Sequence, residues 1–190
     1  MSATASTMLP LGTPAPDFDL PNVAGGRLSL ADSIGRSLLV IFLCRHCPFV
    51  VHVAGELARV GRTYGDRVAI VAISANDADA YPDDAPASLA KAAAAWGWPF
   101  PVLHDASQAV AKAYHAACTP DFFLFDAGHR LVYRGQLDDA RPGNGVPVTG
   151  KDLRAALDAC LAGRPCAAVQ RPSLGCNIKW RPGNEPAYFG

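Results

Sequence analysis

The sequence predicts an α/β fold in which a central mixed β-sheet is flanked by helices. Two apolar runs of strand length, at 38–43 and 68–74, are followed along the chain by segments with helical spacing. Two short apolar segments on either side of the turn at 126–129 have the pattern of a β-hairpin. Strands that alternate with helices and end in a hairpin indicate a layered α/β domain.

The first part of the chain supplies the predicted centre of the sheet. Residues 17–20 alternate polar and apolar side chains, as a half-exposed strand does, and residues 27–30 are a candidate hairpin partner. The run at 38–43 is apolar on both faces, which is typical of a central strand in a covered sheet. Beyond Pro48, which suits a first helical turn, apolar residues recur at helical spacing. These residues are Val50, Val53, Leu57 and Val60.

The remaining elements follow in the order expected for this architecture. They are a buried strand at 68–74, an Ala-rich helix at 87–98, a short strand at 101–104, a helix at 107–116, hairpin strands at 122–125 and 130–133, and an amphipathic helix at 151–161. The polar segment 75–86 is a long connection, and long loops in compact domains are often functional. We expect one domain at 1–162 and a C-terminal tail at 163–190, which packs on the domain or extends from it.

Composition limits the classes of function. The 190 residues, half of them apolar, are enough for one well-filled core and too few to favour two domains. The 17 basic and 17 acidic side chains balance, and no basic cluster marks a surface for nucleic acid or an anionic membrane. Because the N-terminus lacks the basic and long apolar regions of a signal peptide, we predict a cytoplasmic protein. In a reducing cytosol its six cysteines are mostly thiols.

Two cysteines, Cys44 and Cys47, lie between the central strand and the helix that follows it. If the helix begins near Cys44, that sulfur faces unpaired N–H groups and the positive end of the helix dipole, which stabilise a thiolate. Cys44 is then the nucleophile, and Cys47, one turn further on, is the resolving thiol. Arg45 and His46 add positive charge, so we expect the pKa of Cys44 to lie below the free value of about 8.5.

The main alternative for this spacing is half of a zinc site. Zinc needs four ligands, which usually come from a second paired motif, and the sequence contains none. His52, Cys118 or Cys176 completes such a site only if the fold brings it there by accident. The sequence therefore favours redox chemistry, with no metal and no other cofactor.

Five separated motifs connect the chain to a known group of proteins. They are CRHCPFV at 44–50, YPDD at 81–84, CTPDFFLFD at 118–126, YRGQLDD at 133–139 and GCNIKW at 175–180. In these motifs, and in the order of its elements, the chain resembles the thioredoxin superfamily. Within it, the chain is similar to a peroxiredoxin-like branch related to alkyl hydroperoxide reductase and thiol-specific antioxidant proteins. The resemblance implies a thioredoxin-like fold in which Thr119-Pro120 is a cis-proline loop against the cysteine turn.

The same resemblance implies a choice between two reactions. Peroxiredoxins carry the motif P-x-x-x-T-x-x-C, and if Cys47 occupies the peroxidatic position, Cys44 and Val40 replace the threonine and the proline. Without those groups the site lacks donors that stabilise the breaking O–O bond. We therefore favour dithiol-disulfide exchange with protein or small-molecule partners, such as thioredoxin or glutathione systems. A thiol peroxidase is the alternative, and a metal-binding protein using cysteines and histidines is a distant third.

Other features of the resemblance concern supporting residues. Arg45, His46 and Pro48 are expected to support the cysteine pair. His46, directly before the second cysteine, is similar to protein disulfide isomerases, which implies a reduction potential above about −270 mV. Cys118 and Cys176 are candidate additional redox thiols.

Several chemically active side chains have simpler interpretations. Cys160 is expected to be structural. Cys166 and Cys176 flank a Pro-containing segment and could pair with each other or approach the active site, although a structural thiol is the simpler interpretation of each. The acidic pairs at 83–84 and 138–139 are expected to be solvated loop charges, although either pair could position a loop or relay a proton. Three tryptophans are expected to pack in the core: Trp96, Trp98 and Trp180.

Overall fold

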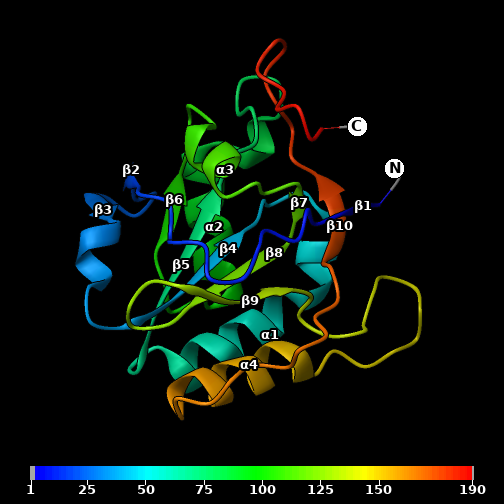
Figure 1. Ribbon diagram of the computed structural model, residues 1–190. Helices are drawn as coiled ribbons and strands as arrows, with labels where there is room; N and C mark the ends of the chain where they lie inside the picture. Colours follow the sequence, from blue (N-terminus) through cyan, green and yellow to red (C-terminus); the bar gives the residue numbers. More distant parts are fainter. Residues whose placement is uncertain (1–2, 190) are drawn as a thin grey trace.

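The computed structural model describes residues 3–189 and has a five-stranded mixed sheet at its centre, with the strand order β6-β5-β4-β8-β9 (Figure 1). The middle strand, β4 (Ser37–Phe42), is parallel to β5 (Val68–Ser74) and antiparallel to β8 (Asp121–Phe125). The outer strands are β6 (Val102–His104), parallel to β5, and β9 (Leu131–Gly135), antiparallel to β8. This arrangement confirms the predicted fold class.

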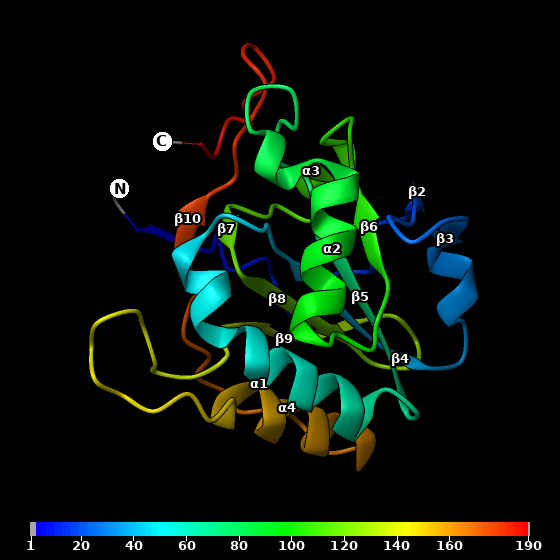
Figure 2. The same cartoon turned by 180° about the vertical axis from the view of Figure 1, so that it is seen from behind.

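Side chains from the two faces of β4 enter two different apolar cores. Leu39 and Ile41 pack in one core, and Leu38, Val40 and Phe42 pack in the other. The first core is covered by α1 (Pro48–Tyr64), α2 (Pro86–Trp96) and α4 (Lys151–Leu161), and the second contains α3 (Ala109–Ala113). Helices α1 and α4 lie side by side in both views (Figures 1 and 2). Burial on both faces explains why the β4 sequence is an unbroken apolar run.

The N-terminal hairpin also forms as the alternating pattern predicts. Strand β2 (Asp19–Pro21) pairs antiparallel with β3 (Arg27–Ser29). Among residues 3–189, no helix combines the length and the apolar character needed to cross a membrane.

A second sheet joins the two ends of the chain to the middle. Its strand order is β1-β10-β7, with β1 (Thr4–Ala5), β10 (Leu174–Asn177) and β7 (Cys118–Thr119). The segment after residue 163 thus contains a strand that the sequence analysis missed. It has few residues and no apolar alternation, and its pairing partners are distant in the sequence, so no local pattern marks it. The division of the chain at residue 162 stays a prediction.

Candidate active site

The cysteine turn lies at the carboxyl end of the central strand, where β4 gives way to α1 (Figure 2). Helix α1 begins at Pro48, and its N-cap is Cys47. The expectation that the helix begins near Cys44 is therefore wrong by about one turn. Proline fits the first helical position because it lacks an N–H, and it disfavours the helical conformation of the preceding residue. Cys47, with φ −73° and ψ 120°, is accordingly extended, and it is Cys47 that lies at the helix N-terminus.

Both cysteine side chains are nearly inaccessible to solvent and contact the same residue of the β7–β8 loop. Cys44 is 1% exposed and Cys47 is 0% exposed. The Thr119-Pro120 peptide bond is cis, as the resemblance implied. The hydroxyl Oγ1 of Thr119 lies 3.4 Å from Cys44 Sγ, and the carbonyl oxygen of Thr119 lies 3.1 Å from Cys47 Sγ. The loop therefore lies directly against both sulfurs.

The hydrogen bond between the two cysteines shifts their pKa values in opposite directions. The hydrogen bond with Cys44 lowers the pKa of Cys47 to about 5, with further help from Cys176, Thr119 and the Val50 backbone N–H. The same hydrogen bond, together with burial and the charge of Asp84, raises the pKa of Cys44 above its usual value. The expectation of a lowered pKa for Cys44 is thus wrong for the resting dithiol, in which the favoured thiolate is Cys47.

One contact opposes this distribution of charge. The carbonyl of Thr119 accepts a hydrogen bond from Cys47 only when Cys47 is a thiol. The net pKa of Cys47 is nevertheless lowered, so its thiolate is favoured at rest. The Thr119 hydroxyl can donate to a thiolate on Cys44, so Thr119 also fits the opposite arrangement, in which Cys47 holds the proton.

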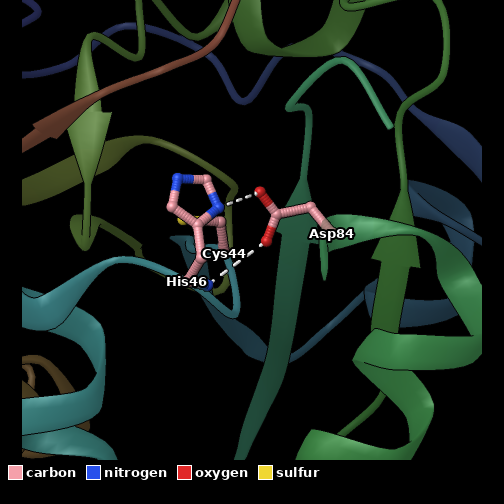
Figure 3. A group of neighbouring side chains, drawn as sticks. All are labelled: Cys44, His46 and Asp84. Carbon is pink, nitrogen blue, oxygen red and sulfur yellow. Dashed lines mark hydrogen bonds and ion pairs between the residues drawn. The ribbon is translucent and has the colours of Figure 1, made fainter. Parts of the chain in front are cut away.

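A buried carboxylate organises the turn between the cysteines (Figure 3). Asp84 is fully buried, and its Oδ1 accepts a hydrogen bond from the backbone N–H of Arg45 at 2.7 Å. Its Oδ2 lies 2.6 Å from His46 Nδ1 and accepts a hydrogen bond from Asn76 Nδ2 at 2.7 Å. The His46 ring also stacks on Tyr81, with centroids 5.6 Å apart. Asp84 therefore fixes both the backbone of the turn and the orientation of the imidazole.

The same group offers the donor types of a metal site. Single ligand atoms of Cys44, His46 and Asp84 lie within 4.8 Å of one another. Two ligands of one tetrahedral zinc ion, each at about 2.0–2.1 Å, are about 3.3 Å apart. The separation of 2.6 Å between His46 Nδ1 and Asp84 Oδ2 is shorter than that and is a direct contact between the two side chains. The group therefore fits a close His–Asp pair better than a metal site.

The two acidic pairs each contain one side chain that differs from the sequence-based interpretation. Asp84 and Asp138 are buried, whereas the Asp83 side chain is 66% exposed and pairs with Arg45. Asp138 accepts hydrogen bonds from the backbone N–H groups of residues 140, 149 and 150, and so holds the loop before α4. Solvated charge was the wrong interpretation for these two residues because local sequence does not show which loop carboxylate turns toward unpaired N–H groups.

The remaining cysteines separate by location. Cys176 lies in β10, where its Cα pairs with Thr119, and it belongs to the apolar cluster that contains Cys44 and Cys47. Cys118 is also buried, but its sulfur lies 3.8 Å from the carbonyl oxygen of Pro120. Two half-buried cysteines lie away from the turn, in α4 and just beyond it: Cys160 and Cys166. None of the six forms a disulfide.

The fold and this dithiol turn define a protein of the thioredoxin-like class. The model of the AhpC/TSA family matches residues 11–134, and the chain belongs to that family. This confirms the resemblance to the thioredoxin superfamily and its peroxiredoxin-like branch.

Individual relatives agree with this assignment. The thiol-disulfide oxidoreductase ResA of Geobacillus kaustophilus (strain HTA426) is 28% identical over 126 residues, which cover 65% of this chain and 67% of that protein. The crystal structure of an uncharacterized conserved protein from Geobacillus kaustophilus is 53% identical, with a TM-score of 0.93 and coverage of 96% of this chain and 98% of that one. A thiol:disulfide interchange protein from Chlorobium tepidum TLS is 19% identical, with a TM-score of 0.62 and coverage of 80% and 99%, and shares the fold.

Proposed function

We propose that this protein is a thiol-disulfide oxidoreductase in which Cys44 and Cys47 cycle between a dithiol and a disulfide. The observation that carries the proposal is the placement of both sulfurs against Thr119, with the pKa of Cys47 lowered to about 5. At neutral pH one thiolate is then available, and the thiolate is the form that attacks disulfides. Membership of the AhpC/TSA family and the relative ResA support the same activity.

In this proposal Cys44 is the attacking sulfur and Cys47 first acts as its base. The proton of the Cys44 thiol moves along the hydrogen bond to Cys47. Thr119 stabilises the product of that transfer, because its hydroxyl donates to the Cys44 thiolate and its carbonyl accepts from the Cys47 thiol. No separate carboxylate base is needed for either cysteine.

The reaction then proceeds through a mixed disulfide. The Cys44 thiolate attacks one sulfur of the partner disulfide, and the other partner sulfur leaves as a thiolate and takes the proton from Cys47. Cys47 attacks Cys44, so that the Cys44–Cys47 bond forms and the second partner thiolate leaves. Two electrons pass from the dithiol to the partner, and the reverse sequence oxidises a partner dithiol.

The expected partners are proteins or small molecules that carry thiols or disulfides, including thioredoxin or glutathione systems. A groove of about 500 Å³ lies beside the cysteine turn and supports this expectation. It is lined by His46, Ala80, Tyr81, Pro82, Asp83 and Lys179. An extended segment of a partner protein can approach the turn along this groove.

Turnover of a peptide disulfide with dithiothreitol as the reductant tests the proposal. We expect Cys44→Ser and Cys47→Ser each to lower the rate by at least about a hundredfold, since each removes a reacting sulfur. Cys160→Ser is the matched control and should keep the full rate. The Cys47→Ser variant should accumulate a mixed disulfide on Cys44 when it is treated with oxidised glutathione. Retention of activity by Cys44→Ser would contradict the assigned order of attack.

A thiol peroxidase is the second candidate, favoured by Cys47 at the N-cap of α1 and by the family. In that reaction the Cys47 thiolate attacks a peroxide oxygen, the O–O bond breaks, and a sulfenic acid and an alcohol or water form. The Cys44 thiol then condenses with the sulfenic acid and releases water. We expect equal concentrations of hydrogen peroxide to oxidise the protein more slowly than oxidised glutathione. The opposite order of rates would make the peroxidase the first candidate.

Three sequence-based expectations stay predictions: a cytoplasmic location, an antioxidant role and a reduction potential above about −270 mV.

A further inference from the structure

The strand β10 brings a third thiol to the cysteine pair. Cys176 is 3% exposed, and its Cα pairs across the sheet with Thr119, the residue whose oxygens contact both active-site sulfurs. Strand β10 also contacts α1, which begins directly after Cys47 (Figure 2). Three buried cysteines, two from the turn after β4 and one from β10, therefore belong to the same apolar cluster beside the cis-proline loop.

Gly175 makes this close approach possible. A Cβ atom at residue 175 would lie 2.0 Å from the carbonyl oxygen of Thr119, far inside any van der Waals contact. Any side chain there would push β10 away from β7, and Cys176 away from Cys47. A glycine is therefore needed at residue 175 of the GCNIKW motif for β10 to lie this close to β7. The proposed dithiol reaction does not involve the neighbouring Cys176.

The hydrogen bonding of Cys176 agrees with its position. Burial, followed by the hydrogen bond to Cys47, raises the pKa of Cys176 to about 12. Cys176 is therefore a thiol at neutral pH, in the same apolar cluster as Cys47. Cys118 provides a contrast, because it is equally buried and lies in the paired strand β7, but its sulfur approaches the carbonyl groups of Pro120 and Ser173.

We propose that Cys176 is a second disulfide partner of Cys47, so that the oxidised site can hold either a Cys44–Cys47 or a Cys47–Cys176 bond. This inference rests on the proposed oxidoreductase function and extends it. Cys176 loses its proton and attacks the Cys47 sulfur of the Cys44–Cys47 disulfide. The Cys47–Cys176 bond forms, the Cys44–Cys47 bond breaks, and Cys44 leaves as a thiolate that takes up the proton. No external oxidant or reductant is consumed.

This exchange has a functional consequence. When the disulfide lies between Cys47 and Cys176, Cys44 is again a free thiol in a protein that still holds the oxidising equivalents. The oxidised protein can therefore carry a reactive thiol. A site with only two cysteines cannot do so, because both are used in its disulfide.

The test compares serine variants of the full chain. Reduced Cys44→Ser is equilibrated with oxidised glutathione, its free thiols are blocked with N-ethylmaleimide, and its disulfides are mapped by mass spectrometry. We expect a Cys47–Cys176 disulfide in Cys44→Ser and in the matched control that also carries Cys118→Ser. The double variant with Cys176→Ser should carry glutathione on Cys47. Wild-type protein treated in the same way should contain a fraction with Cys47–Cys176 and a blocked Cys44, and Gly175→Ala should reduce that fraction.

The outcomes separate the two proposals. If wild-type protein forms Cys44–Cys47 but neither it nor Cys44→Ser forms Cys47–Cys176, the further inference is overturned and the proposed function stands. If Cys47–Cys176 forms but Cys44–Cys47 never does, the proposed dithiol reaction is overturned, and so is the exchange between two disulfides, because Cys176 is then the sole disulfide partner of Cys47.

Discussion

Two groups of cysteines in the same protein, the proposed reactive pair and the two near α4, differ in what surrounds their sulfurs. Cys47 lies at the helix N-terminus and is closed off from solvent, whereas Cys166, just beyond α4, is half-buried. Exposure alone would make Cys166 the reactive thiol. Its pKa is nevertheless raised to about 11 by burial, while hydrogen bonds lower the pKa of Cys47 to about 5.

The difference lies in the polar neighbours of each sulfur. Cys166 meets one carbonyl oxygen, that of Ala156 at 3.6 Å, which favours a thiol. Cys47 has several donors around it, which stabilise a thiolate even in a buried site. In the proposed function, hydrogen bonding rather than accessibility therefore selects the sulfur that is a thiolate at neutral pH.

The largest expected effect comes from the carboxylate that holds the cysteine turn. Asp84→Asn removes the charge that binds the Arg45 backbone and His46, and it leaves buried donors poorly paired. We expect the free energy of unfolding to fall by about 1–3 kcal/mol and the pKa of Cys44 to fall, because the Asp84 charge raises it. Chemical denaturation and titration of Cys44 measure the two effects.

The neighbouring Asp83 gives the control for that variant. Its side chain is 66% exposed, so Asp83→Asn should change stability by less than about 0.5 kcal/mol. Equal effects of the two substitutions would show that Asp84 does not hold the turn.

The pH dependence of alkylation compares the two groups of cysteines directly. Cys47 is protonated and unreactive below its pKa, so its rate with iodoacetamide should rise through a midpoint near pH 5 and level off above it. Cys166, with a pKa of about 11, should still be accelerating at pH 9. Because Cys47 is closed off from solvent and Cys166 is not, the quantity compared is the pH midpoint of each rate and not its size. Mass spectrometry measures the rate of alkylation of each cysteine separately. The same pH profile for Cys47 and Cys166 would contradict the difference between their pKa values.

The smallest expected effect tests single hydroxyl contacts of equal length in the two groups. Thr119 Oγ1 lies 3.4 Å from Cys44 Sγ, and Ser37 Oγ lies 3.4 Å from Cys160 Sγ. Thr119→Val should slow disulfide exchange about fivefold, the effect of one hydrogen bond of about 1 kcal/mol. Ser37→Ala should leave the rate of exchange unchanged. Steady-state turnover of a peptide disulfide measures the rate of exchange in both variants. Equal rates in Thr119→Val and Ser37→Ala would show that the Thr119 hydroxyl has no role in the reaction.

Much of this architecture follows from local patterns in the sequence. The apolar run of β4, the strand β5 and the helix α4 have short-range periodicity, and each lies within a residue of its predicted position. The cysteine pair is recognisable in the sequence because two cysteines three residues apart lie between a predicted strand and a predicted helix.

Other features depend on contacts between distant segments. Asp84 is held in the interior by the backbone N–H of Arg45, which is distant in the sequence, and by the side-chain amide of Asn76 from the same connection. Strand β10 exists because β1 and β7 offer it hydrogen bonds. The start of α1 at Pro48 differs from the expected start near Cys44, because proline disfavours the helical conformation of the residue before it, Cys47. The favoured thiolate is Cys47 rather than Cys44, chiefly because the hydrogen bond with Cys44 lowers the pKa of Cys47.

The most direct test of the central claim is disulfide mapping in wild-type protein after brief equilibration with oxidised glutathione. The account predicts a disulfide from Cys47 to Cys44, with a fraction passed on to Cys176, while Cys160 and Cys166 stay reduced. Thiols at Cys44 and Cys47 that stay reduced under these conditions, or oxidation that begins at Cys160 or Cys166, would contradict it.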